Sequence, residues 1–351
     1  MGEVHIVGAG NAGCYLGQQL KRKGIDFQIF EEHPEVGKPP HCTGLVSKNI
    51  DELLDVSKDV VLNQVKGAKL FSPDETCLKL TRDEDQAYVF DRVGFDKKLA
   101  EGLEISTGKR IENLNQEAEF IVGADGPHST VAELGNFPEL EKTITGVQVE
   151  IENENMSKDF VEMYFGEDIA PGFFAWIVPM DKRLKVGLAS NENPGKYLDR
   201  FISEKFGEPE ILEKYGGVLP MKWRGEIWKD HIALVGDAAG QVKPTSGGGV
   251  YMGFKSAKIL ADAIEKKDLE VYEELWSLKV KPELNYALMI RKFLDRLTDK
   301  KMNKLWELLN KPEVKKLIEE HGDMDKPSKL IKEAVKNPIL LSYLPYLRYL
   351  W

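Results

Sequence analysis

Residues 3–13 read EVHIVGAGNAG, and this stretch decides the beginning of the fold. Residues 3–7 predict a short buried strand, residues 11–23 have helical spacing, and residues 26–30 predict a second strand. A strand, a helix and a strand in this order make a βαβ unit. The chain therefore opens with a parallel sheet.

The glycines between the first strand and the helix follow a G-x-G-x-x-G pattern. Gly8 allows a tight turn, Gly10 lets the backbone approach a pyrophosphate, and Gly13 permits close packing of helix on strand. Asn11 and Ala12 begin the helix, whose N-terminus presents free N–H groups to phosphates. This loop predicts a bound dinucleotide.

An acidic residue closes the second strand about twenty residues after the glycines, the distance at which a carboxylate meets a ribose 2′-OH. Glu31 has this position, and Glu32 is a less favoured substitute. A solvated charge at a strand end is the alternative for Glu31.

Two later glycine-aspartate loops each follow a short apolar strand. Residues 123–126 read GADG and residues 236–240 read GDAAG. Ligands of open α/β folds lie at the carboxyl ends of the strands, so both loops face the expected ligand. Gly236 and Asp237 are placed to bind a ribityl or pyrophosphate group, whereas Asp125 is better suited to organising its turn.

These loops resemble the glutathione-reductase-type FAD family, which includes the aromatic hydroxylases and, within it, the geranylgeranyl reductases. The resemblance covers nearly the whole chain and implies FAD as cofactor. Hydroxylases usually carry a His and then Pro and Gly-Gln-Gly after the Gly-Asp motif; residues 240–250 read GQVKPTSGGGV, which is similar to the reductases. Gly247, Gly248, Gly249 and Val250 would bring N–H groups to the flavin pyrimidine edge, where the reduced flavin is anionic.

Residues 39–44, hereafter the Cys42 loop, read PPHCTG and are similar to the Cys-Ala-Gly or Cys-Gly-Gly loop of archaeal reductases. That resemblance implies that Cys42, Thr43 and Gly44 lie by the flavin ring and that Cys42 takes part in catalysis. Alkene reduction needs a weak acid at the carbon that does not receive hydride. His41 is a poorer candidate for this acid, and a plain core position is the alternative for Cys42.

Two further motifs follow from the same resemblance. Residues 174–179 read FAWIVP and resemble the Tyr-x-Trp-x-Phe-Pro motif that lines the isoprenoid cavity, which implies substrate contacts for Phe174, Trp176 and Val178. Phe174 and Val178 depart from the motif but keep an apolar wall, and ordinary core is the alternative to a substrate contact for Trp176. Arg92 matches the Arg of an Arg-x-x-Phe-Asp pattern that reaches the FAD phosphates, with a surface salt bridge as the alternative.

The predicted fold class is α/β: a Rossmann-like FAD-binding domain interrupted by an antiparallel-sheet substrate domain, with a C-terminal helical region. The FAD-binding domain takes residues 1–45, 91–140 and 225–265, the substrate domain takes 46–90 and 141–224, and helices take 266–351. Apolar runs at 145–151, 160–165, 173–178 and 184–189 predict the antiparallel strands. After residue 249 the spacing is helical nearly to the end.

Composition limits the partners and the location. A net charge of −10 argues against a nucleic-acid partner. The three cysteines lack paired spacing, which argues against a metal site and favours a reducing, cytoplasmic setting. Neither a basic leader nor a run of about 18 apolar residues is present, so we expect a soluble protein that is neither exported nor membrane-spanning.

The last thirteen residues, 339–351, combine leucines with four aromatic residues and follow Lys329, Lys332 and Lys336. This pattern suits peripheral contact with the inner face of a membrane, and packing on the protein itself or on a dimer partner suits it equally. Residues 299–351 carry a net charge of +3 on an otherwise acidic chain.

The leading hypothesis is an FAD-dependent reductase that saturates geranylgeranyl chains, those of archaeal ether phospholipids first among them. One alternative is a flavin-dependent hydroxylase of the same fold, against which the missing His weighs. A second is a non-enzymatic carrier of prenyl lipids that retains flavin. The electron donor stays open between a nicotinamide, a deazaflavin and ferredoxin, because no second nucleotide fingerprint occurs.

Overall fold

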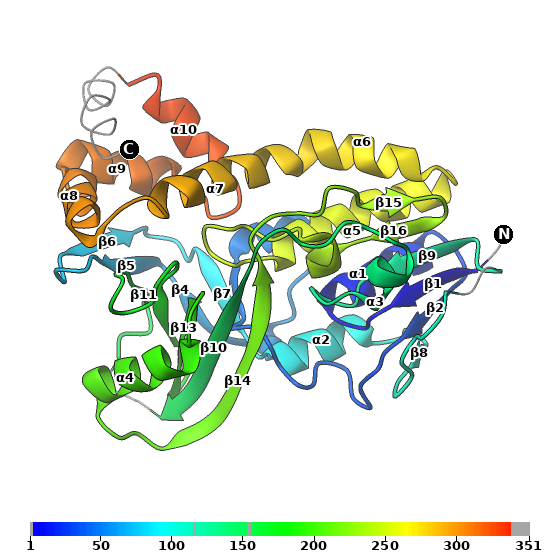
Figure 1. The fold of residues 1–351 in the computed structure, drawn as a ribbon, viewed down its shortest axis with the longest axis horizontal. Helices are drawn as coiled ribbons and strands as arrows, with labels where there is room; N and C mark the ends of the chain where they lie inside the picture. The colour runs from blue at the N-terminus through cyan, green and yellow to red at the C-terminus, as the bar shows by residue number, and fades with distance from the viewer. Residues whose placement is uncertain (1–2, 115–116, 153–155, 338–351) are drawn as a thin grey trace.

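The computed structural model describes residues 3–114, 117–152 and 156–337 of the 351-residue chain. These residues form three β-sheets with helices packed around them, which agrees with the predicted α/β class (Figure 1). The predictions for the tail at 339–351 lie outside the described residues.

The first sheet has six strands in the order β15-β16-β9-β1-β2-β8. They are β1 (Val4–Val7), β2 (Phe27–Phe30), β8 (Ile105–Ser106), β9 (Phe120–Gly123), β15 (Trp228–Lys229) and β16 (Ile232–Leu234). All neighbouring pairs are parallel except β15 with β16, so the predicted parallel start is confirmed. Ile232 of β16 lies opposite Ile121 of β9, so this sheet is completed only after the second sheet has been inserted.

The second sheet has seven strands in the order β14-β10-β13-β12-β11-β5-β6. They are β5 (Gly67–Phe71), β6 (Cys77–Thr81), β10 (Thr143–Glu152), β11 (Phe160–Tyr164), β12 (Ala175–Pro179), β13 (Arg183–Ser190) and β14 (Ile211–Pro220). The predicted antiparallel arrangement is confirmed for every pair except β5 with β11, which is parallel. Strand β5 comes from the segment before residue 91 and joins the sheet beside a strand formed much later in the chain.

The third sheet is a small antiparallel one, β3-β7-β4, that packs against the seven-stranded sheet. Its strands are β3 (Leu45–Ser47), β4 (Val61–Val65) and β7 (Ala87–Phe90). Two short 3₁₀ helices, η1 (Lys48–Glu52) and η2 (Lys58–Val60), lie between β3 and β4. Val65 and Val89 from this sheet share one buried cluster with Val161 and Val178 from the larger sheet.

The helices among the described residues are α1 (Asn11–Arg22), α2 (Arg92–Ala100), α3 (Thr130–Leu134), α4 (Pro194–Phe206), α5 (Val250–Glu265), α6 (Leu269–Lys279), α7 (Lys281–Leu294), α8 (Asp299–Leu309), α9 (Pro312–His321) and α10 (Ser328–Ala334). Helix α2 begins at Arg92, because the Asp91 side chain accepts the Val93 N–H and caps it.

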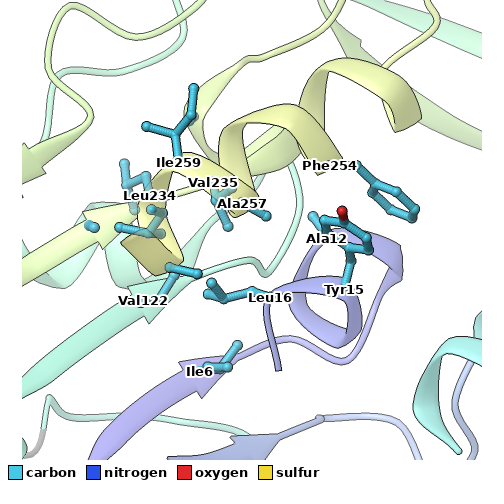
Figure 2. Close-up of a cluster of buried hydrophobic side chains, with 14 of the residues drawn as sticks. Ile6, Ala12, Tyr15, Leu16, Val122, Leu234, Val235, Phe254, Ala257 and Ile259 are labelled. Atoms are coloured by element: carbon cyan, nitrogen blue, oxygen red, sulfur yellow. The ribbon is translucent and has the colours of Figure 1, made fainter. Parts of the chain in front are cut away.

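Helices α1 and α5 pack together over the parallel sheet and form the main core (Figure 2). Tyr15 and Phe254 stack between them with ring centroids 4.1 Å apart. In Figure 1, α6 and α7 extend from this core towards α8, which lies beside the seven-stranded sheet. Trp306 of α8 donates its indole N–H to the Leu70 carbonyl of β5 at 2.8 Å, which ties the C-terminal helices to that sheet.

Candidate flavin site

Three loops from distant parts of the chain meet at the carboxyl edge of the parallel sheet. Gly8 has φ 103°, and a Cβ at that position would overlap the Ala124 carbonyl of the second loop. Gly236 has φ 67°, and its Cβ would lie 2.8 Å from the Cβ of Ala12. The loop that begins at Gly8 therefore packs closely on the loops at 123–126 and 236–240 only because Gly8 and Gly236 have no side chain.

Gly10 and Gly13 have different surroundings. A Cβ on Gly10 would have no heavy atom within 4 Å, and Gly10 is the N-cap of α1 without any side-chain cap. A Cβ on Gly13 would overlap the Gly8 carbonyl. The helix N-terminus is thus open to an anion where the sequence predicts the pyrophosphate, and this open space fits a dinucleotide.

Glu31 is held at the strand end by the loop that it faces. Its Oε2 accepts the Ala9 N–H at 2.8 Å and its Oε1 accepts the His33 N–H at 2.9 Å. A carboxylate offers about four acceptor positions, so room for a ribose hydroxyl remains. Glu32 instead has an exposed side chain near Arg110, at 3.8 Å between Oε2 and Nε. This difference favours Glu31 over Glu32 for the ribose.

Arg92 is 6% exposed, so the alternative of a surface salt bridge is wrong. Its Nη2 donates to both Asp96 carboxylate oxygens, at 2.8 and 2.9 Å. Its Nε and Nη1 are buried and have no hydrogen-bond partner. Buried polar groups are nearly always paired, and a guanidinium matches a phosphate well. Arg92 therefore fits a cofactor phosphate.

Asp125 organises its own turn, as the sequence indicated. Its Oδ2 accepts the Val131 N–H of α3 at 3.1 Å. Its Oδ1 is buried without a partner, and burial raises the pKa of this carboxyl.

Asp237 lies in the 3₁₀ helix η3 (Gly236–Ala239) and is partly buried. Burial raises its pKa to about 6, and Arg92 acts in the opposite direction. A Cβ on Gly249 would lie 2.9 Å from Asp237 Oδ1, so the bare backbone at Gly249 is what lets this carboxylate approach the start of α5.

A buried glutamine that sequence reasoning did not single out holds the Asp237 loop. The Gly236 N–H donates to Gln241 Oε1 at 2.8 Å, and Gln241 Nε2 donates to the Tyr272 hydroxyl at 2.8 Å. Tyr272 in turn donates to the Leu234 carbonyl of β16 at 2.8 Å. Gln241 lies in the 240–250 motif, but Tyr272 is 31 residues away and belongs to no motif, so only the fold reveals their pairing.

The triple-glycine loop, residues 243–249, precedes α5, which begins at Val250. Backbone hydrogen bonds within the loop hold its shape. The Gly247 N–H donates to the Lys243 carbonyl at 2.8 Å, and the Lys243 N–H donates to the Gly248 carbonyl at 3.2 Å. The Lys243 ammonium lies 2.5 Å from Asp325 Oδ1. No sequence pattern indicates this ion pair, which joins the loop to the C-terminal region.

The Cys42 loop lies between the seven-stranded sheet and the start of helix α2. On one side, His41 Nδ1 donates to the Gly216 carbonyl of β14 at 2.8 Å. On the other, a Cβ on Gly44 would lie 3.0 Å from Arg92 Cγ. Cys42 is partly exposed, unlike the fully buried Cys14, so a plain core position does not describe it.

The three apolar residues of the FAWIVP motif differ in their surroundings. Phe174 is buried and stacks on Phe173 with centroids 4.2 Å apart, and Val178 is buried between two sheets. Trp176 is partly exposed, and its indole N–H points to Gln148 Oε1 at 3.4 Å. Of the three, Trp176 is the side chain that is open to a ligand in this structure.

Comparison with known proteins gives two family models within the chain: the geranylgeranyl reductase catalytic domain over residues 142–219 and an NAD(P)-binding Rossmann-like domain over residues 6–43. An uncharacterized protein of Methanocaldococcus jannaschii is 33% identical, with 95% of each chain covered. The chain belongs to the geranylgeranyl reductase family. It is a flavin-dependent oxidoreductase.

Named relatives and solved structures also align with this chain over most of its length. A digeranylgeranylglycerophospholipid reductase of M. jannaschii is 27% identical over 97% of each chain. A geranylgeranyl bacteriochlorophyll reductase-like structure from Thermoplasma acidophilum superposes with a TM-score of 0.83 at 23% identity, covering 99% of each chain. A p-nitrophenol 4-monooxygenase from Pseudomonas putida superposes at 0.70 with 15% identity, which is a likeness of fold alone.

Among the described residues, no helix is long and apolar enough to cross a membrane. No group of three or more His, Cys, Asp and Glu side chains in the same part of the chain could hold a metal ion.

Proposed function

We propose that this reductase uses FAD to saturate C=C bonds in geranylgeranyl chains, those of archaeal ether phospholipids. The observation that carries the proposal is the place of the Cys42 loop. His41 is bonded to the seven-stranded sheet, which also carries Trp176, while Gly44 packs on Arg92, so the Cys42 loop connects that sheet with the proposed flavin site. The reductase names of several full-length relatives support the same substrate class.

We assign FAD to the loops at the edge of the parallel sheet. Gly8, Gly10, Asn11, Ala12, Gly13 and Arg92 would hold its phosphates, and Glu31 its ribose. Asp125 shapes its turn, while Gly236 and Asp237 would face the ribityl side. Gly247, Gly248, Gly249 and Val250 would present N–H groups to the pyrimidine edge, and Thr43 and Gly44 would lie by the ring. Glu32, which is exposed, is the weakest of the assigned residues.

The chemistry divides between cofactor and chain. Bound FAD would supply a hydride to one alkene carbon. Cys42 would hold a proton for the other carbon, Trp176 would form part of the substrate wall, and the buried Phe174 and Val178 would support that wall from behind. Residues 1–45, 91–140 and 225–265 would form the FAD-binding domain, 46–90 and 141–224 the substrate domain, and 266–351 the helical region.

The partners follow from the substrate. We propose a cytoplasmic enzyme that meets its lipid at the inner face of the membrane through the aromatic C-terminal residues.

The flavin is reduced by one of three donors: a nicotinamide, a deazaflavin or ferredoxin. Testing each donor for anaerobic bleaching of the flavin absorbance identifies the reductant.

The test of the function is a single-turnover reaction. Anaerobic photoreduction followed by an unsaturated diether lipid should reoxidise the flavin and add mass to the lipid in steps of two hydrogens. An unchanged lipid would overturn the proposal. A Cys42→Ser variant should keep its flavin spectrum and lose most of the lipid step, whereas full turnover would remove Cys42 from the mechanism.

A further inference from the structure

A buried glutamine on β10, the second strand of the seven-stranded sheet, contacts both parts of the proposed reaction site. Gln148 of β10 is 2% exposed. Its Oε1 accepts the Thr43 hydroxyl at 2.8 Å and lies 3.4 Å from the Trp176 indole nitrogen. Thr43 is the neighbour of Cys42 in the chain. One side-chain oxygen thus connects the loop that carries the thiol with the proposed substrate wall.

The missing side chain of Gly187 makes this connection sterically possible. Gly187 of β13 lies between Gln148 and Trp176 in the strand register. A Cβ there would lie 2.6 Å from Gln148 Cβ and 2.6 Å from Trp176 Cζ2. Both contacts are shorter than van der Waals distance, so only glycine lets the indole lie across β13 and reach the amide.

A second buried side chain holds the same residue of the loop. Lys185 of β13 is 3% exposed and donates to the Thr43 carbonyl at 3.0 Å. Behind it, Glu150 Oε1 lies 3.8 Å from the Lys185 ammonium and accepts the Tyr215 hydroxyl at 2.9 Å. Thr43 is therefore fixed by its hydroxyl and by its carbonyl, from two adjacent strands of one sheet.

We propose that Gln148 is a positioning residue that holds the Cys42 loop in place and ties it to Trp176. The inference rests on the proposed role of Cys42. Gln148 touches neither the reacting carbons nor the flavin in this assignment; it acts through Thr43. A lipid chain lying against Trp176 and the thiol that protonates it are thereby kept at a constant separation.

The test uses the reactivity of Cys42 towards iodoacetamide in a Cys77→Ser background, because Cys77 is exposed and Cys14 is buried. Gln148→Met keeps the size and neutrality of the side chain and removes the acceptor. Losing a hydrogen bond of ordinary strength should raise the open fraction of the loop, and hence the alkylation rate, by roughly five-fold. Thr43→Val should give the same increase, and the double variant no more than either single one.

A matched control is Gln19→Met on α1. Gln19 is also a buried glutamine, and its side-chain Nε2 has no hydrogen-bond partner. In the Gln19→Met variant, Cys42 should be alkylated at the parental rate.

With lipid substrate, Gln148→Met should lower kcat about ten-fold and leave KM within about two-fold, since the loop and not lipid binding is affected. Parental alkylation in Gln148→Met, or additive effects with Thr43→Val, would overturn the inference. If the parental protein fails to reduce lipid, the proposed function fails while the alkylation result still decides this inference.

Discussion

Gly10 and Gly13 lie three residues apart, and the structure separates a glycine needed for a ligand from one needed for the fold. The backbone of Gly10, at φ −70° and ψ −178°, accepts an alanine, and its Cβ would meet only open space. Gly10→Ala should therefore keep the unfolding midpoint of the flavin-free protein and weaken FAD binding at least about ten-fold, by blocking the pyrophosphate. Flavin fluorescence titration and thermal unfolding measure the two effects.

Gly13→Ala is the contrasting variant, because its Cβ would overlap the Gly8 carbonyl. It should lower the unfolding midpoint as well as flavin binding. Equal FAD affinity for Gly10→Ala and the parent would show that the open space at Gly10 holds no phosphate.

Asp237 predicts a pH dependence of folding. Burial raises the pKa of this carboxyl from its ordinary 3.8 to about 6. The folded protein then binds the proton more tightly than the unfolded chain, so this group lowers stability as pH rises through about 4 to 6 and the loss persists above that window. Asp237→Asn should make the flavin-free protein more stable at pH 7.5, by on the order of 2 kcal/mol, and nearly equal to the parent at pH 3.5. Urea unfolding at the two pH values measures this, and a pH-independent difference would contradict it.

Residues within local motifs could be placed from sequence, but residues that act through long-range pairs could not. In the glycine-rich loop containing Gly8, the spacing of the glycines alone predicts a dinucleotide-binding turn. Gln148 and Gln241 are ordinary glutamines in the sequence, and their importance comes from partners 105 and 31 residues away. Arg92 was placed by its motif, yet its burial and its two unpaired nitrogens appear only in the fold.

At the scale of elements, the ion pair between Lys243 and Asp325 joins the triple-glycine loop to the segment between α9 and α10. The two side chains are 7% and 1% exposed. Asp325→Ala would leave the Lys243 ammonium buried without its carboxylate, which typically costs about 3–5 kcal/mol. We expect a correspondingly lower free energy of unfolding in urea, and faster amide exchange in residues 243–249.

Asp181→Ala provides the comparison, since Asp181 pairs with Lys158 at 2.7 Å while both side chains are more than half exposed. Solvent screens such pairs strongly, so the unfolding midpoint should not move. If Asp325→Ala behaved in the same way, the ion pair would have no structural role in the loop.

Elements with regular apolar spacing were predictable, and those formed by pairing alone were not. Strand β14 includes Glu213, Lys214, Gly216 and Gly217, a composition that does not favour a strand. Its extended form comes from its antiparallel register with β10, for example Gly217 opposite Gly146. Strand β8 has only two residues and exists because it completes the edge beside β2.

For the whole molecule, the C-terminal residues offer a test of membrane contact. Residues 339–351 are rich in leucine and aromatic residues, and they follow a basic flank that includes Lys332. A chain ending at residue 337 should lose most of its binding to vesicles that contain anionic lipid, while its flavin spectrum stays unchanged. Vesicle flotation measures the bound fraction. Equal binding by both chains would place the membrane contact elsewhere.

The overall architecture was largely predictable, including a parallel sheet interrupted by an antiparallel one. The parallel pairing of β5 with β11 was not, because it joins residues about ninety positions apart, for example Gly67 with Phe160. Apolar alternation identifies a strand but does not choose its neighbour. Such choices depend on how whole segments pack, which no short window of sequence contains.

The interrupted sheet has a consequence for the order of events during synthesis. Strand β9 leaves the ribosome more than one hundred residues before its partner β16. The edge that β9 offers meanwhile is unpaired, and the last glycine loop of the flavin site follows β16 at 243–249. A nascent chain therefore has no complete flavin site until both segments have emerged, so retention of flavin by ribosome-bound chains would report the moment at which this sheet closes.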